Sequence, residues 1–239
     1  MAVIIARVTY LLAIGEHLRT RRGGIAIPVY LGDSLQWNVK TKGGGQIDMF
    51  AEDEVTIYVP PPKEKDSPSN LDFPRGLCED PAKFDAVIDT MLGQSEAKAS
   101  AEAVTATLKR KVKLPEHELA TLETTYKELR KLKEAGRNHI WGYVARNLSR
   151  PIWLSSNERK ADVIVGNPPW LSFRYMDAEM QRKARDEMKG KNLWVGGKLA
   201  THQDLSGLFF ARAVELYMKR DGLIAFVMPL AALTRGQFE

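Results

Sequence analysis

Apolar side chains recur at helical spacing in several segments of the chain. The clearest helix is predicted over residues 117–137, where leucines and a tyrosine return at near-heptad spacing and Gly136 stops the pattern. The opposite face of this helix carries lysines and arginines, diluted by glutamates. Comparable periodicity predicts helices over residues 3–20, 81–92, 95–108, 140–148, 177–189 and 204–220.

Short runs of β-branched and aromatic residues predict the strands. Residues 163–165, Val-Ile-Val, have the composition of a buried parallel strand, and residues 223–228 form a second buried run. A further short strand is predicted over residues 55–59. We also expect a strand over residues 25–31 although it contains Pro28, which suits an edge or a bulge.

Four residues of specific chemistry follow the strand at 163–165, at the edge where open α/β sheets bind ligands. Pro168 and Pro169 each push the preceding residue to extended geometry and lack an N–H, so the segment offers carbonyl oxygens and few donors. Asn167 adds a side-chain amide and Trp170 adds a flat ring. This arrangement suits a planar group that carries an NH2. The alternative is a proline turn with Trp170 as a core anchor.

The sequence Asn-Pro-Pro-Trp, after Asp, three apolar residues and Gly, resembles the catalytic motif of the S-adenosylmethionine-dependent amino-methyltransferases. It is most similar to that of the N6-adenine-specific DNA methyltransferases of restriction-modification systems. The resemblance implies a Rossmann-like methyltransferase fold with S-adenosyl-L-methionine as the cofactor. It implies catalytic roles for Asn167, Pro168, Pro169 and Trp170, and places Asn167 beside the cofactor as well.

Residues 32–35, Gly-Asp-Ser-Leu, follow the strand expected at 25–31. The resemblance implies that the Asp33 carboxylate accepts a hydrogen bond from the adenine amino group of the cofactor, and that Leu35 borders the adenine plane. The alternative is a plain turn in which Asp33 satisfies local backbone donors. The same letters occur in GDSL esterases, with Ser34 as the nucleophile. That family needs an aspartate three residues before a histidine, and no histidine of this chain has one.

Composition limits the class of protein. A chain of 239 residues, 44% hydrophobic and 27% charged, can form one α/β domain with a sizeable insertion. The single cysteine, Cys78, excludes an internal disulfide and a multi-cysteine zinc site, so we expect no metal and a cytoplasmic location. No apolar run is long enough to span a membrane. The net charge of +5 permits contact with a polyanion without demonstrating it.

The Gly-Asp-Ser-Leu and Asn-Pro-Pro-Trp segments lie far apart in the sequence, and we interpret the residues between them as an insertion. We expect an α/β protein with a partial Rossmann-like sheet. Its parts are a first methyltransferase segment at residues 1–37, a mostly helical insertion at 38–160 and a second methyltransferase segment at 161–239. Residues 60–74, rich in proline and charge, are predicted to be a linker or exposed loop, and Asp221-Gly222 to be a turn.

Two groups of side chains offer contacts to a nucleic acid. Arg174 and Tyr175, just after the motif, suit a base or a phosphate of the substrate DNA, or else a packed loop. The basic face of the helix at 117–137 suits DNA phosphates, or else is the solvated face of a helical hairpin.

The resemblance implies methyl transfer from S-adenosylmethionine to N6 of an adenine flipped out of double-stranded DNA, within a larger restriction-modification enzyme. A protein glutamine N-methyltransferase and a non-catalytic DNA-binding subunit are the alternatives. The family's glycine-rich loop for the methionine end of the cofactor does not occur before Asp33. We therefore expect missing N-terminal and C-terminal parts of the same enzyme, or a specificity subunit, as partners. Residues 1–239 alone are expected to bind the cofactor weakly or not at all, and to be inactive.

Overall fold

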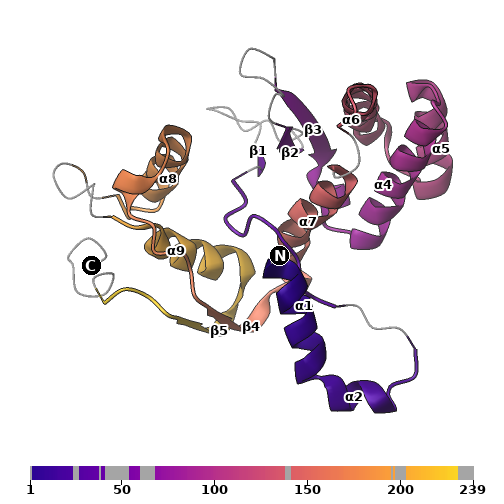
Figure 1. Ribbon diagram of the computed structural model, residues 1–239. Helices are drawn as coiled ribbons and strands as arrows, with labels where there is room; N and C mark the ends of the chain where they lie inside the picture. The colour runs from indigo at the N-terminus through magenta and orange to yellow at the C-terminus, as the bar shows by residue number, and fades with distance from the viewer. Residues whose placement is uncertain are drawn as a thin grey trace.

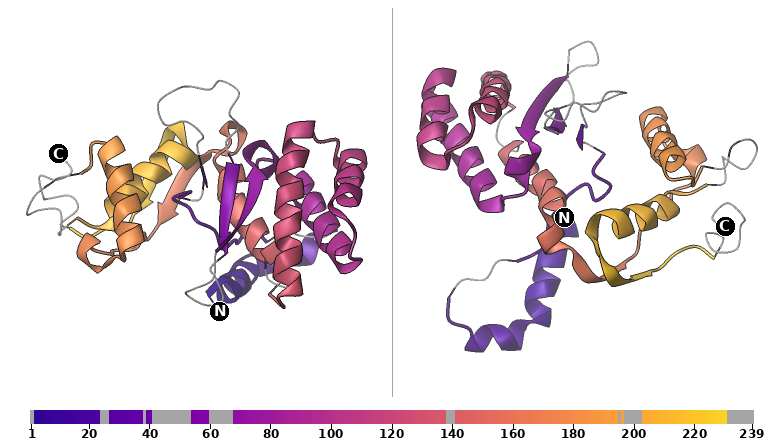
Figure 2. Two further views of the ribbon diagram at one scale, coloured as in Figure 1. Left: turned by 90° about the horizontal axis from the view of Figure 1, so that it is seen from above. Right: turned by 180° about the vertical axis from the view of Figure 1, so that it is seen from behind.

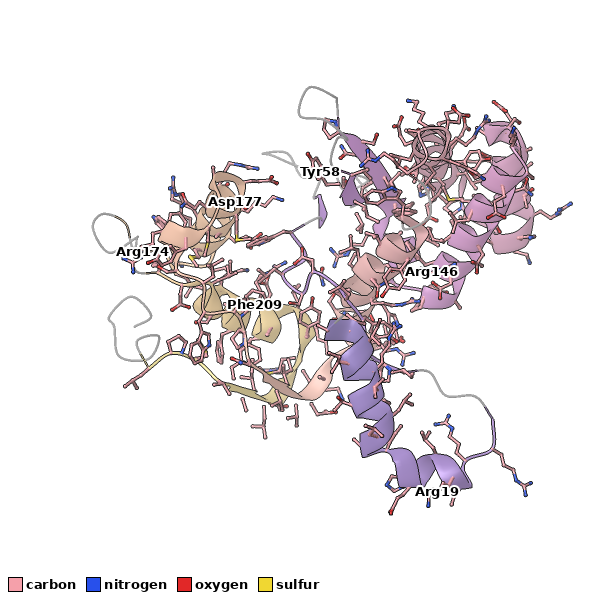
Figure 3. The ribbon with its side chains drawn as sticks, viewed as in Figure 1. Arg19, Tyr58, Arg146, Arg174, Asp177 and Phe209 are labelled. Atoms are coloured by element: carbon pink, nitrogen blue, oxygen red, sulfur yellow. The ribbon has the colours of Figure 1, made fainter. Side chains whose placement is uncertain are left out.

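The computed structural model describes residues 2–23, 27–37, 39–40, 54–59, 68–137, 141–194, 196 and 203–230. It is an α/β structure with two groups of elements and a projecting arm (Figure 1). The arm consists of α1 (Ala2–Ala13) and α2 (Gly15–Thr20), so the helix expected over residues 3–20 is interrupted at Ile14. Neither helix buries a side chain. Arg19 lies near the far end of the arm, away from both groups (Figure 3).

The first group, which we call the helical lobe, consists of described residues between 54 and 154. Its elements are β2 (Glu54–Val59), β3 (Ser69–Pro74), α3 (Arg75–Cys78), α4 (Pro81–Glu96), α5 (Ala101–Val112), α6 (Glu116–Glu134) and α7 (Trp141–Leu154). Strand β3 pairs antiparallel with β2, which also pairs with the short β1 (Val39–Lys40). Apolar side chains of β2 and β3 alternate toward the helices, and the rings of Phe73 and Phe84 meet at 5.1 Å between centroids.

Local signals explain where these helices begin and end. The side chain of Asp80 accepts hydrogen bonds from the backbone N–H groups of Ala82 and Lys83 at the start of α4. On α6, the predicted apolar stripe is buried, including Leu122 and Tyr126. Three of its basic residues pair with glutamates on the same helix: Lys127 with Glu123, Arg130 with Glu134 and Lys131 with Glu128. This pairing favours the solvated face over a phosphate-binding face.

The second group, which we call the motif lobe, consists of described residues between 157 and 230. Its elements are β4 (Ala161–Gly166), α8 (Ala178–Gly190), α9 (Leu205–Tyr217) and β5 (Met218–Phe226), with single 3-10 turns at Asn157–Arg159 and Phe173–Tyr175. Strands β4 and β5 pair in parallel. Both helices lie on one side of this strand pair (Figures 1 and 2). A small core joins Leu35, Phe173, Met188 and Leu208.

Strands β4 and β5 are parallel as expected, but the prediction that they are buried is wrong. Val163, Val165, Leu223 and Val227 are exposed, Val165 by 77%. These residues share the strand face opposite α9, and among the described residues no helix covers that face. The β-branched composition therefore correctly indicated a strand but overstated its burial.

Three further predictions about elements are wrong, and one predicted helix is longer than expected. Residues 27–31 form no strand: Pro28 has no N–H for a ladder, and the N–H of Val29 bonds instead to the carbonyl of Ile27 at 2.8 Å. Residues 69–74, expected in a loop, form β3 because their apolar positions alternate and pair with β2. The helix predicted over residues 140–148 is present as α7, which continues through Pro151 to Leu154. Asp221 and Gly222 lie within β5, where its pairing with β4 shifts register.

Three expectations were only partly met or lie outside the described residues. The helix expected over 95–108 starts at Ala101, because α4 extends to Glu96 and Lys98 takes a left-handed conformation. Residues 25–26 and 60–67 lie outside the described part of the chain. Within the described part, no helix combines the length and the apolar character needed to cross a membrane.

Candidate functional site

The motif is held at both ends by Val227, the residue that directly follows β5. The N–H of Val227 donates to the carbonyl of Gly166 at 3.0 Å, just before the motif. The carbonyl of Val227 accepts from Nε1 of Trp170 at 3.1 Å, at the end of the motif. Asn167 and Pro169 are exposed between these two bonds, and Pro168 is buried. These two hydrogen bonds to Val227, which we call the Val227 bracket, fix the motif at the carboxyl end of β4, as the sequence predicts for a ligand-binding turn.

The amide of Asn167 is left available by this arrangement. No hydrogen bond joins its side chain to any other residue within the described ranges. The Trp170 side chain is 55% exposed, so it is not a core anchor, and its hydrogen bond to Val227 limits the tilt of the ring. An available amide next to a restrained aromatic ring is the pair of features that a planar group with an NH2 requires.

A cavity of about 270 Å3 adjoins the motif. Its lining includes Asn167, Pro168 and Pro169 of the motif and Ser34 of the turn. Its other walls are largely apolar, from β4, α9 and β5: Ile164, Val165, Gly166, Phe209, Ala213, Tyr217 and Phe226. Phe209, which Figure 3 labels, comes from α9. The cavity thus joins the two segments that the sequence singles out, although the Trp170 ring lies outside its lining.

Asp33 forms the turn that the sequence offered as an alternative to cofactor contact. One carboxylate oxygen accepts from the N–H of Leu35 at 3.0 Å and the other from the N–H of Trp37 at 2.7 Å. A carboxylate has about four lone-pair positions, so a further donor can still be accepted. Leu35 is 3% exposed and packs in the core of the motif lobe. It anchors the turn in that core, and its contact with an adenine ring stays a prediction.

Helix α9 holds this turn through groups that the sequence analysis did not single out. The hydroxyl of Tyr217 donates to the carbonyl of Ser34 at 2.7 Å and accepts from Nε2 of Gln36 at 3.2 Å. Nε and Nη2 of Arg212 donate to the carbonyl of Leu35 at 3.1 and 2.7 Å. Burial raises the pKa of Tyr217 to about 12, so the hydroxyl keeps its proton and donates at neutral pH. A tyrosine hydroxyl on an apolar helix stripe was the available signal.

Arg174 and Tyr175 lie beside the motif but do not line the cavity. Both are exposed, and the guanidinium of Arg174 lies 4.8 Å from the centroid of the Tyr175 ring. Arg174 lies at the outer edge of the motif lobe in Figure 3, and the neighbouring Asp177 caps α8. Their exposure excludes the packed-loop alternative for these two side chains, while their contact with DNA stays a prediction.

The residues of the cavity fit the adenosine part of S-adenosylmethionine. Its aromatic and apolar walls suit a nucleoside. Asp33 does not line the cavity, but it precedes the lining residue Ser34 and its carboxylate retains acceptor capacity. Among the described lining residues none carries a positive charge, so nothing there pairs with the methionine carboxylate. The fit is therefore to one end of the cofactor.

The fold and the site define an α/β protein with an Asn-Pro-Pro motif that borders a cavity at the carboxyl end of a parallel strand pair. A family model described as Eco57I restriction-modification methylase matches residues 1–238. The chain therefore belongs to the Eco57I restriction-modification methylase family, and DNA methylation is the activity that this family suggests. No curated protein and no solved structure matches the chain.

Proposed function

We propose that this chain forms the target-base site of an adenine-specific DNA methyltransferase, which transfers a methyl group from S-adenosylmethionine to N6 of a flipped adenine. The observation that carries the proposal is the available amide of Asn167, fixed beside the cavity by the Val227 bracket. Flipping the base out of the duplex costs a few kcal/mol, which contacts in the site must offset.

In this mechanism the side-chain oxygen of Asn167 accepts one hydrogen of the adenine amino group and the carbonyl of Pro168 accepts the other. The nitrogen lone pair, otherwise delocalised into the ring, becomes localised on nitrogen. The Trp170 ring stacks on the base, an interaction worth about 1–3 kcal/mol in single-strand binders. When bound, S-adenosylmethionine supplies an electrophilic methyl group. Catalysis then rests on positioning and electrostatics, which need no catalytic histidine, cysteine or metal cluster.

The proposal assigns the surroundings of the site as follows. Asp33 contacts the adenine end of the cofactor with its remaining acceptor capacity. Arg174 and Tyr175 contact the DNA next to the flipped base, where their stacked and exposed side chains suit a phosphate and a base face. Parts of the intact enzyme outside the described residues hold the methionine end of the cofactor.

The test compares Asn167→Ala with Asn157→Ala in the intact protein. Asn157 is exposed in a 3-10 turn away from the cavity and serves as the matched control. Asn167→Ala should lower the methylation rate about 10²-fold or more, as removal of a group that binds the reacting atoms does in other enzymes. The control should keep the wild-type rate. A wild-type rate for Asn167→Ala contradicts the mechanism.

The chemical class of the product tests the substrate. With a labelled methyl donor and duplex DNA, hydrolysis to nucleosides should place the label on N6-methyladenine. Label on a glutamine side chain of an added protein substrate, with none on DNA, would assign the site to the protein methyltransferases.

A further inference from the structure

Helix α7 of the helical lobe contacts the segment that leads into the Asp33 turn. The side-chain oxygen of Asn147 accepts from the N–H of Leu31 at 3.1 Å, and Nδ2 of the same amide donates to the carbonyl of Tyr143 at 2.7 Å. Asn147 is 6% exposed. One amide therefore joins the helix backbone to the entry of the turn, in a buried position where an unmade bond is costly.

The same place on α7 is shaped by a proline. Pro151 lies inside the helix and has no N–H to donate to the carbonyl of Asn147, four residues earlier. Gly32 lies directly against this break. A Cβ on Gly32 would stand 2.6 Å from Cγ of Pro151 and 2.9 Å from the carbonyl oxygen of Asn147. Contacts that short do not occur in folded proteins, so only glycine fits here without displacing the turn.

The far end of the turn returns to the same helix. Nε2 of Gln36 donates to the carbonyl of Pro151 at 3.1 Å, as well as to the hydroxyl of Tyr217. Gln36 is 6% exposed and adopts a left-handed backbone conformation, with φ of 55°. Non-glycine residues adopt this conformation at an energetic cost, so the contacts of the Gln36 side chain hold it in place.

We propose that α7 holds the Gly32–Gln36 turn in position, and that Asn147 and Pro151 are thereby positioning residues for the cofactor. This role rests on the proposed function of the turn. The helical lobe then takes part in the site, because it sets where Asp33 and Ser34 stand relative to the motif. A displaced turn moves the Asp33 carboxylate away from the adenosine end of the cofactor, while Asn167 and Trp170 stay where Val227 holds them.

The experiment uses Gly32→Ala and Asn147→Ala in the intact protein, with Gly93→Ala as the matched control. Gly93 lies in α4 and has no atom within 4 Å of an added Cβ. Gly32→Ala should weaken S-adenosylmethionine binding roughly tenfold or more, as expected for a misplaced site. Asn147→Ala should weaken it less, and the control should bind like wild type. Calorimetric titration gives the affinities, and thermal melting shows that the variants fold.

A double-mutant cycle separates positioning from general damage. Once the Gly32→Ala substitution has displaced the turn, Asn147 has nothing left to hold, so the two losses in affinity should not add. Fully additive losses, or wild-type affinity for Gly32→Ala, would overturn the proposal.

Hydrogen exchange gives a readout that does not depend on cofactor binding. The amides of Leu31, Leu35 and Trp37 are bonded to Asn147 and Asp33, and should lose protection in Gly32→Ala relative to Gly93→Ala. If these amides lose protection in a protein that binds no S-adenosylmethionine, the positioning of the turn by α7 is supported and the proposed function is contradicted. If they keep wild-type protection, α7 does not position the turn and the proposal is refuted.

Discussion

The two lobes differ in how completely they bury their apolar residues. In the helical lobe, β2 and β3 place Ile57, Leu71 and Phe73 against helices, and each is at most 1% exposed. In the motif lobe, β4 and β5 leave Val165 and Leu223 exposed by 77% and 70%. The comparison teaches that the most completely buried core lies in the helical lobe, whereas the motif lies in the lobe with the more exposed sheet. The helical lobe has a closed core, whereas the motif lobe presents an apolar sheet face of the kind that other elements cover.

The largest expected effect compares one residue from each region. Phe84→Ala removes a ring with no exposed surface and should lower the free energy of unfolding by about 3–5 kcal/mol. Val165→Ala removes a largely exposed side chain and should change it by less than about 0.5 kcal/mol. Urea unfolding of the intact protein measures both. A loss well above about 1 kcal/mol for Val165→Ala would break the comparison and show that the intact protein covers this face.

The second prediction concerns how the sheet of the helical lobe ends. Strand β3 is an outer strand, and the hydroxyl of Thr125 on α6 bonds to both the N–H and the carbonyl of Asp72. Thr125→Val should lower the free energy of unfolding by about 1–3 kcal/mol, because it leaves these backbone groups without that partner.

Thr124→Val is the matched control, since Thr124 is exposed on the same helix and its hydroxyl donates to the carbonyl of Ala120 in its own helical turn. Its variant should melt like the wild type. Equal melting temperatures for the two variants would show that solvent replaces the Thr125 bonds and that the edge is less protected than its contacts indicate.

The smallest expected effect lies at the junction of the turn and α9. Burial raises the pKa of Tyr217 to about 12, above its ordinary value of 10.0. Between these pH values the unfolded chain has lost a proton that native Tyr217 still holds, so the free energy of unfolding falls as pH rises through this window. Tyr217→Phe removes this titration and should show a shallower fall than wild type in urea unfolding across the window. Parallel curves for the two proteins would contradict the burial of this hydroxyl.

Local patterns were enough to predict most helices. The apolar stripe of α6 and the aspartates that cap α4, α8 and α9 are properties of neighbouring residues, and those helices begin close to the predicted positions. The turn at Asp33 and the motif after β4 were also found from short segments, because their chemistry is contained in a few consecutive side chains.

What the sequence did not reveal depends on residues far along the chain. Residues 69–74 form a strand because β2 offers a partner for their two alternating apolar side chains, and that partner is not visible in the segment itself. The burial of Leu35 depends on packing with α8 and α9. The exposure of Val165 depends on what covers the sheet. The position of Gly32 depends on its contact with Pro151. The sequence shows that Pro151 disturbs a helix, but it does not show that Gly32 packs against it.

The contacts around the turn also set the order in which this chain can fold. The Tyr217 hydroxyl reaches the Ser34 carbonyl across 183 positions, and Asn147 reaches Leu31 across 116. Closing such loops costs conformational entropy before any contact repays it, whereas α4 to α6 bring nearby segments together. The helical lobe can therefore form early, while the turn is fixed only after both distant helices exist. Nascent chains should reach a folded helical lobe well before they acquire a competent site.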